Sequence, residues 1–137
     1  MLKAVEMADS DELKSEVLRE RVLKGKTPNT REFIIFLDDE EGGLLIYEDW
    51  GRPESYIYEI FVLHNARKHG VGTWILSQAE LVALELGRTS ISLTARSLCR
   101  EELSDEELVS WYEKHGYVRS SVEKNTLKKH LSLPSIR

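Results

Sequence analysis

Residues 67–72 have the sequence Arg-Lys-His-Gly-Val-Gly and lie between a β-like segment and the clearest helical pattern in the chain. Two glycines let the backbone approach a ligand closely, and the first-turn N–H groups of a helix have no partners within the helix. Such a helix start binds anions, pyrophosphate in particular. The motif lacks the Gly-Lys-Ser/Thr ending of a P-loop and the three glycines of a dinucleotide fingerprint. Taken alone, it is equally compatible with an ordinary helix start.

The predicted strand before this motif, 56–63, carries a single carboxylate, Glu59. Strand alternation gives it two faces, one with Tyr56, Tyr58, Ile60 and Val62 and the other with Ile57, Glu59, Phe61 and Leu63. Both are otherwise apolar, which is typical of a central strand covered on two sides. Burying a carboxylate costs free energy unless the group is paired, protonated or functional. Burial also favours the neutral form of a carboxylate, and a carboxylate shifted in this way suits general-base catalysis. The alternative is that Glu59 simply bonds a hydroxyl or a basic residue.

A third segment, residues 111–117, has the sequence Trp-Tyr-Glu-Lys-His-Gly-Tyr. Tyr112 falls at the end of an amphipathic helical pattern, just before a glycine that stops the helix. A tyrosine in that place usually packs its ring and leaves its hydroxyl at the surface. On its own, the segment therefore favours a structural role for Tyr112.

The elements that must position these residues follow from hydrophobic periodicity and turn residues. Helices are predicted at about 11–24, with Ser10 as N-cap, at 70–87, and at 104–114, where Ser104 and Glu107 form a capping box. An acidic hairpin tip is predicted at 38–43. The predicted strands are 2–7, 32–37, 44–47, 56–63, 90–95, 117–121 and 126–131. This order predicts one mixed α/β or α+β domain over 1–137, with 132–137 as a short tail.

Composition narrows the class of protein. The 137 residues are 41% hydrophobic and 31% charged, with no long apolar run, which predicts a soluble globular domain without a membrane partner. The N-terminus lacks the apolar core of a signal peptide, and Cys99 is the only cysteine, so we expect a cytoplasmic location. Residues 1–60 carry a balance of −7 and residues 61–137 of +2. The net charge of −5 argues against a nucleic-acid partner.

The three segments together resemble the GNAT superfamily of acyl-CoA-dependent N-acetyltransferases. Residues 59–62 and 67–72 match its acetyl-CoA motif, R/Q-x-x-G-x-G/A after a central strand, and residues 111–117 are similar to its F-Y-E-K-x-G-F signature. The resemblance extends over about residues 2–131. It implies a mixed, mostly antiparallel sheet of six or seven strands with three main helices, and it allows a homodimer.

The resemblance also implies roles for residues. The pantetheine arm of acetyl-CoA would insert where the central strand and the next strand splay apart. Glu59 would take a proton from the incoming amine, directly or through water, and Tyr112 would protonate the departing thiolate. No metal and no cysteine nucleophile are needed. The cofactor-binding residues would be Phe61, Val62 and Leu63 on the strand, and Arg67, Lys68, His69, Gly70, Val71, Gly72 and Thr73 on the loop.

Three features depart from the family pattern. Asp105 stands where an asparagine is frequent, which puts that contact with coenzyme A in question. The connection 97–103 is longer than usual. The chain has room for about one helix between its first two strands where the family has two, so the acceptor side is expected to be open.

The acceptor is predicted only as a primary amine, on a small molecule or a protein. Glu48, Asp49 and Glu54 favour a cationic amine, such as a polyamine, an amino sugar or a lysine side chain. Trp50 either lines such a site by cation–π contact or is ordinary packing. The alternative to an enzyme is a module of the same fold that senses acyl-CoA without turnover.

Overall fold

The computed structural model describes residues 1–67 and 70–132, and within them the chain forms both helices and strands. The elements are β1 (Leu2–Glu6), the 3₁₀ turn η1 (Ser10–Glu12), α1 (Glu16–Gly25), β2 (Thr30–Leu37), β3 (Glu40–Glu48), β4 (Glu54–Val62), the 3₁₀ turn η2 (His64–Ala66), α2 (Val71–Glu85), β5 (Ser90–Thr94), α3 (Asp105–Lys114), β6 (Val118–Arg119) and β7 (Thr126–His130).

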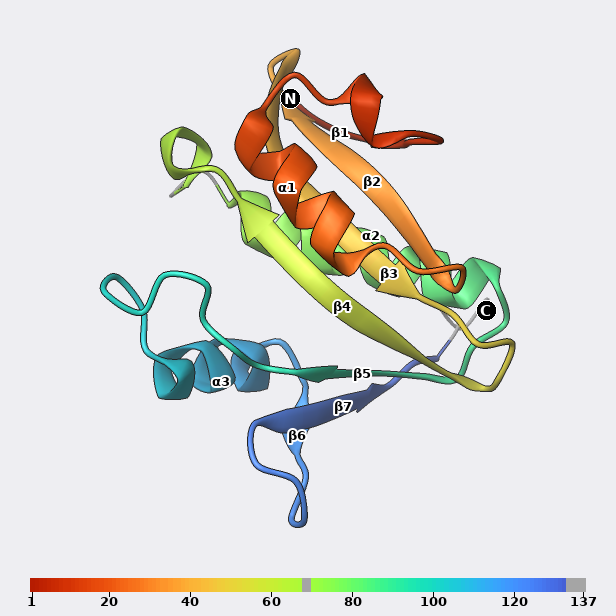
Figure 1. The fold of residues 1–137 in the computed structure, drawn as a ribbon. Helices are drawn as coiled ribbons and strands as arrows, with labels where there is room; N and C mark the ends of the chain where they lie inside the picture. Colours follow the sequence, from red (N-terminus) through yellow and green to blue (C-terminus); the bar gives the residue numbers. More distant parts are fainter. Residues whose placement is uncertain (68–69, 133–137) are drawn as a thin grey trace.

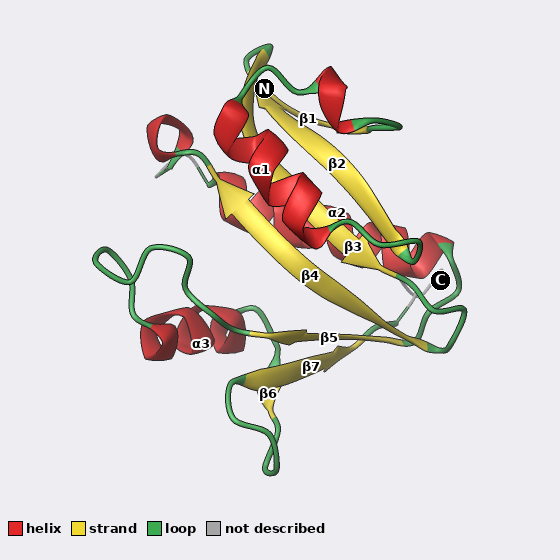
Figure 2. Ribbon diagram, in the orientation of Figure 1, coloured by secondary structure: helices red, strands yellow, loops and turns green. Residues whose placement is uncertain are grey.

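The strands form one seven-stranded sheet in the order β1-β2-β3-β4-β5-β7-β6 (Figure 1). Every neighbouring pair is antiparallel except β4 and β5, which are parallel. Figure 2 shows α1 and α2 on opposite faces of the β2–β4 part of the sheet. The mostly antiparallel sheet and the three helices confirm the predicted fold class.

Two apolar layers cover the two faces of the sheet. Side chains of β2 and β3 alternate between them, as strand geometry requires. Ile34, Leu44 and Ile46 pack under α1, whereas Ile35 and Leu45 pack with α2 and α3. Burial on both faces explains why these two strands are nearly continuous apolar runs rather than alternating ones.

The first helix differs from the prediction of about 11–24 with Ser10 as its cap. Asp9 caps the short turn η1, and Ser15 caps α1. Between them Leu13 is extended and almost fully buried, at 1% exposure. The Glu41 carboxylate accepts hydrogen bonds of 2.8 Å from the N–H groups of both Lys14 and Ser15. The break is therefore stabilised by a side chain from a distant strand, which local sequence patterns cannot reveal.

The hairpin between β2 and β3 is also tighter than predicted. Asp38 and Asp39 alone form the tip, with φ of 51° and 69°, as a two-residue hairpin turn requires. The two glycines after them belong to β3. Gly42 is the extra residue of a bulge opposite the Ile35–Phe36 step.

A second bulge sets the direction of side chains in β4. Glu59 pairs with Ile46 and Ile57 pairs with Tyr47, so Tyr58 is an extra residue between them. The bulge interrupts the alternation, and Ile57 packs in the layer of α2 while Glu59 points to the side of α1. The prediction that Ile57 and Glu59 share a face was wrong for this reason.

Gly43 marks a close approach of β3 to β4. A Cβ on Gly43 would lie 2.6 Å from the carbonyl oxygen of Phe61, which cannot rotate away as a side chain could. We expect Gly43→Ala to lower the free energy of unfolding by about 1–3 kcal/mol, measured by urea denaturation. Gly72→Ala is the matched control, since its Cβ would meet only the Trp111 ring, at 3.7 Å. Equal unfolding midpoints for the two variants would contradict the prediction.

The parallel pair β4 and β5 stays together over only a short distance. The paired residues are Glu54 with Ser90, Ser55 with Ile91 and Tyr56 with Ser92. Beyond them the strands diverge, as Figure 1 shows, while β4 remains paired with β3 and β5 with β7. The sheet is therefore split on the carboxyl-terminal side of Tyr56 and Ser92. Within residues 1–67 and 70–132, no helix has the length and apolar character that crossing a bilayer demands.

Candidate active site

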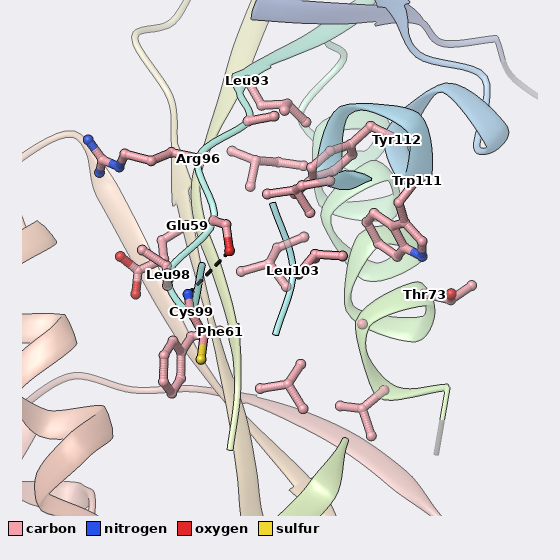
Figure 3. Close-up of a pocket in the computed structure, with 18 of the residues that line it drawn as sticks. Glu59, Phe61, Thr73, Leu93, Arg96, Leu98, Cys99, Leu103, Trp111 and Tyr112 are labelled. Carbon is pink, nitrogen blue, oxygen red and sulfur yellow. Dashed lines mark hydrogen bonds between the residues drawn. The ribbon is translucent and has the colours of Figure 1, made fainter. Parts of the chain in front are cut away.

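A pocket of about 440 Å³ lies at the split (Figure 3). One wall is β4 from Ile57 to Val62, and the opposite wall is the end of β5 with the connection that follows it. The start of α2 and the Trp111–Tyr112 face of α3 complete the pocket. The structure thus brings together the strand, loop and helix segments that the sequence analysis singled out separately.

The loop before α2 has the geometry of an anion site. Gly70 has a φ of 71°, a left-handed conformation that glycine adopts without strain, and none of the described side chains caps the helix that follows. Arg67, Gly70, Val71, Gly72 and Thr73 all line the pocket. The first-turn N–H groups of α2 therefore remain available to a ligand.

The five other predicted cofactor residues have different outcomes. Phe61 and Val62 line the pocket. Leu63 does not line it, and its N–H donates a 2.8 Å hydrogen bond to the carbonyl of Gly42. Lys68 and His69 lie outside the described residues.

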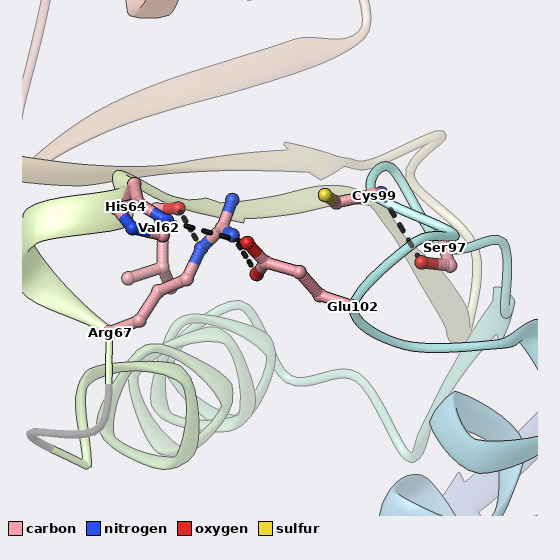
Figure 4. Close-up of polar contacts among 6 residues, drawn as sticks. All are labelled: Val62, His64, Arg67, Ser97, Cys99 and Glu102. Atoms are coloured by element: carbon pink, nitrogen blue, oxygen red, sulfur yellow. Dashed lines mark hydrogen bonds and ion pairs between the residues drawn. The ribbon is translucent and has the colours of Figure 1, made fainter.

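Arg67 lines this pocket and links β4 to the connection after β5 (Figure 4). Its Nε donates to the carbonyl oxygen of Val62 at 3.2 Å, and its Nη1 forms an ion pair with the carboxylate of Glu102. His64 Nδ1 lies 3.5 Å from the same carboxylate. The connection after β5 is thereby tied to the loop before α2.

Glu59 is paired, which sequence reasoning had left as an alternative to a catalytic role. Its side chain is 7% exposed, and its two carboxylate oxygens each accept a 2.8 Å hydrogen bond from the guanidinium of Arg21 in α1. The pair raises the pKa of Arg21, chiefly through the hydrogen bond. Arg21 also lies over the Phe61 ring, 5.5 Å from its centroid. Glu59 nonetheless lines the pocket, so its carboxylate is both held and within the site.

The Arg21–Glu59 pair gives a stability prediction. We expect Arg21→Met to lower the free energy of unfolding by about 2–3 kcal/mol, because it leaves a buried carboxylate without its cation. The matched control is Arg31→Met, which removes a similar two-bond pair with Glu6 whose partners are 36% and 45% exposed. An exposed pair contributes less than about 1 kcal/mol. Equal losses of unfolding free energy in the two variants, measured by urea denaturation, would show that burial is not the reason for the larger effect expected at Arg21.

Tyr112 lies on the other wall of the pocket, and Figure 3 shows it and Glu59 on opposite sides. Its side chain is buried, with edge-on ring contacts to Trp111 at 4.9 Å and to Tyr117 at 5.7 Å. Burial raises the pKa of the Tyr112 hydroxyl well above its ordinary value, so it stays protonated at neutral pH. No described residue hydrogen-bonds to this hydroxyl. Tyr112 is therefore a pocket-lining residue whose protonated hydroxyl is not engaged by any described residue.

Comparison with known proteins identifies this arrangement. A family model described as an acetyltransferase (GNAT) domain matches residues 28–119. The chain belongs to the GNAT acetyltransferases. The match includes the split strands, the loop before α2 and Tyr112, and it confirms the resemblance drawn from the sequence. A search of curated proteins gives no match.

Solved GNAT structures share the fold over almost the whole chain. A GNAT family acetyltransferase from Elizabethkingia anophelis with acetyl-CoA bound has a TM-score of 0.68 at 14% identity, covering 95% of this chain and 98% of that one. The PaiA N-acetyltransferase from Thermoplasma acidophilum in complex with coenzyme A has 0.68 at 12%, with 96% and 99% covered. The ribosomal-protein-S18-alanine N-acetyltransferase from Escherichia coli has 0.73 at 12%, with 98% and 97% covered.

Asp105 has a structural task in this GNAT domain. Its Oδ1 accepts a 2.8 Å hydrogen bond from the N–H of Ser97, and its Oδ2 lies 3.4 Å from the Arg100 guanidinium. The Ser97 N–H is the main reason that the pKa of Asp105 is lowered. Asp105 does not line the pocket. It holds the long connection 97–103 against the start of α3.

The connection 97–103, which the sequence marked as longer than usual in the family, contributes to the GNAT pocket, but its lining residues were not predicted. Leu98, Cys99, Glu102 and Leu103 all line it. Cys99 was expected to have no role in the chemistry, and its position in the wall does not by itself assign one. No signal in these residues alone distinguishes a pocket wall from a surface loop. Among the described residues, no group of three or more His, Cys, Asp or Glu side chains could hold a metal ion.

Arg21 was the other omission. It lies three residues after Leu18 and four before Gly25, both buried, so helical spacing places it on the covered face of α1. A basic residue on an apolar helix face is a signal for a buried acidic partner. The partner itself could be found only once α1 was known to cross β4.

Proposed function

We propose that this GNAT domain transfers an acetyl group from acetyl-CoA to a primary amine in a ternary complex. The observation that carries the proposal is the pocket at the β4–β5 split, which joins an uncapped helix start, two open strand edges and Tyr112 in one cavity. The pantetheine arm of acetyl-CoA would lie along Phe61 and Val62, and its pyrophosphate would be held by Arg67 and the start of α2 from Gly70 to Thr73. Acetyl-CoA or coenzyme A is bound in GNAT structures of the same fold, which supports this assignment.

The reaction follows as direct attack. The neutral amine nitrogen attacks the thioester carbonyl carbon, and a main-chain N–H of β4 stabilises the negative charge that develops on the carbonyl oxygen. The C–S bond then breaks, and Tyr112 donates its proton to the departing thiolate. Glu59 takes the proton that the nitrogen loses, directly or through a water molecule. The solvent returns a proton to Tyr112 and removes one from Glu59.

A second candidate function is an acyl-CoA sensor of the same fold without turnover. The observation that favours it is the Arg21–Glu59 pair, in which both carboxylate oxygens are already engaged. Thiol release from acetyl-CoA against a panel of amines separates the two functions. Thermal stabilisation by acetyl-CoA without thiol release on any amine would favour the sensor. The cytoplasmic location and the homodimer stay predictions.

The Arg67–Glu102 ion pair gives a prediction for cofactor binding. The Glu102 carboxylate lies beside the residues proposed to hold the pyrophosphate, and it repels the phosphates while it occupies Arg67. We expect Glu102→Gln to lower the Kd for acetyl-CoA about threefold to tenfold, measured by isothermal titration calorimetry. The control is Glu106→Gln, since Glu106 pairs with Arg119 outside the pocket. Weaker binding by Glu102→Gln would show instead that Glu102 positions Arg67.

A further inference from the structure

A second pocket, of about 710 Å³, adjoins the first at the β4–β5 split. The two pockets share Ile57, Tyr58, Leu93, Thr94 and Arg96. The second one extends toward the turn between β3 and β4 and the segment between β6 and β7. A molecule held there reaches the place where β4 and β5 separate, and therefore the reacting end of a cofactor in the first pocket. This position makes the second pocket the acceptor side of the proposed reaction.

Two of the three acids that suggested a cationic acceptor are engaged by basic side chains outside the second pocket. Asp49 forms two hydrogen bonds, of 2.6 and 2.9 Å, with Arg88. Glu54 forms a 2.6 Å ion pair with Lys128. Neither acid lines the second pocket. Of the three acids that suggested a cationic amine, only Glu48 lines it, and its carboxylate accepts a 2.6 Å hydrogen bond from the Trp50 ring N–H.

Two arginines in the same pocket have no such partners. Arg52 and Arg96 both line it and are exposed, and neither forms a hydrogen bond or an ion pair with any residue of 1–67 or 70–132. Most other arginines in the described chain have a carboxylate partner: Arg21, Arg31, Arg67, Arg88, Arg100 and Arg119. The pocket therefore presents two guanidinium groups that no described carboxylate binds, although the carboxylates of Glu48 and Glu123 also line it.

The backbone that carries both arginines is braced. Arg52 follows Gly51, whose N–H donates to Asp49, and precedes Pro53, whose carbonyl accepts a 2.8 Å hydrogen bond from Thr89. Arg96 follows Ala95, whose N–H donates a 2.7 Å hydrogen bond to Asn125. In Figure 3, Arg96 extends away from Tyr112 and Trp111. Fixed backbone on both sides lets the pocket recognise one ligand geometry at low entropic cost.

We propose that the acceptor is an amine that also carries an oxyanion, a carboxylate or a phosphate, bound by Arg52 and Arg96. This inference rests on the proposed acetyl transfer and names its substrate class. Guanidinium groups bind such oxyanions through paired, charge-assisted hydrogen bonds. A polyamine would instead bring like charges together in the pocket. Trp50 and Tyr58, 52% and 46% exposed, and the ring of Tyr56 supply an apolar wall for the rest of the acceptor.

The test compares amines that differ only in the oxyanion. Thiol release from acetyl-CoA is measured with L-phenylalanine and 2-phenylethylamine, with O-phosphoethanolamine and ethanolamine, and with spermidine. We expect the kcat/KM ratio of one oxyanion-bearing amine to its partner to fall at least about tenfold in the double variant Arg52→Gln/Arg96→Gln. The two amines of a pair differ in the fraction that is neutral at the assay pH. This difference cancels when the kcat/KM ratio of the wild type is compared with that of the variant. The pair that responds tells carboxylate from phosphate.

Arg119→Gln is the matched control, since Arg119 is exposed and lies in neither pocket, and its ratios are expected to equal those of the wild type. A ratio that the double variant leaves unchanged, or spermidine as the best substrate, would overturn the inference while leaving acetyl transfer intact. Absence of thiol release with every amine would instead contradict the proposed function.

In that last case, binding decides the inference separately. N-acetyl-L-phenylalanine, N-(2-phenylethyl)acetamide, N-acetyl-O-phosphoethanolamine and N-acetylethanolamine are titrated into the protein loaded with coenzyme A. Tighter binding of an oxyanion-bearing ligand than of its partner, lost in the double variant, supports the inference. Equal or undetectable binding within both pairs overturns it.

Discussion

Tyr112→Phe is expected to lower kcat for acetyl transfer about 100-fold, because general acid catalysis by one positioned side chain contributes a factor of about 10²–10⁴. The expectation rests on a tyrosine that lines the pocket and whose hydroxyl is kept protonated by burial. The variant removes one oxygen and keeps the ring, so the contacts with Trp111 and Tyr117 persist. Steady-state thiol release measures kcat, and calorimetry measures the Kd for acetyl-CoA, which should not change.

Tyr117→Phe is the matched control for this prediction. Tyr117 is equally buried, but its hydroxyl donates a 2.9 Å hydrogen bond to Glu80 and it does not line the pocket. Its loss should lower the unfolding midpoint more than it lowers kcat. Wild-type turnover in Tyr112→Phe would remove Tyr112 from the mechanism, and a higher Kd with unchanged kcat would assign it to cofactor binding.

Glu59→Gln is expected to lower kcat about 100-fold, because it removes the proposed general base. Glutamine keeps the shape of the side chain and one oxygen that accepts a hydrogen bond from Arg21, so the variant should fold. The protein lacks a proton acceptor at that position once the carboxylate is gone. Full pH–rate profiles with a saturating amine measure the effect, together with the Kd for acetyl-CoA as a check on the pocket.

Glu32→Gln is the control that separates chemistry from burial. Glu32 is 4% exposed, lies on β2 and is not part of either pocket. Its kcat should equal that of the wild type. A wild-type pH–rate profile in Glu59→Gln would make the Arg21–Glu59 pair a structural brace between α1 and β4, and the base would have to be sought elsewhere.

The sequence was sufficient to predict the features that depend on local patterns. The capping box of Ser104 and Glu107 and the start of α3 were predicted correctly, because both hydrogen bonds lie within four residues. The helix start at Gly70 and the apolar strands β2 and β3 were equally local. The family resemblance then supplied the fold, since the three motifs have a fixed order along the chain.

The errors share a different physical cause. Leu13 ends the turn η1 because Glu41, on a distant strand, binds the next two N–H groups. The face of the sheet on which the Ile57 side chain lies depends on the bulge at Tyr58. The pairing of the Glu59 carboxylate depends on Arg21. These features depend on contacts between segments more than ten residues apart or on a shift of strand register. Neither kind of feature leaves a periodic signal in the sequence.

The short pairing of β4 with β5 gives this sheet four edges instead of two. Beyond Tyr56 and Ser92, each strand presents to the other a row of main-chain groups that no β-ladder satisfies. Exposed edges of this kind recruit other strands, and a flexible amide-containing ligand can fill the place of one. The coenzyme arm, with its two amides, would act as a removable eighth strand. When the coenzyme leaves, the edges of β4 and β5 inside the sheet are unpaired again. A bound coenzyme should therefore protect the protein from aggregation, in addition to supplying the acetyl group.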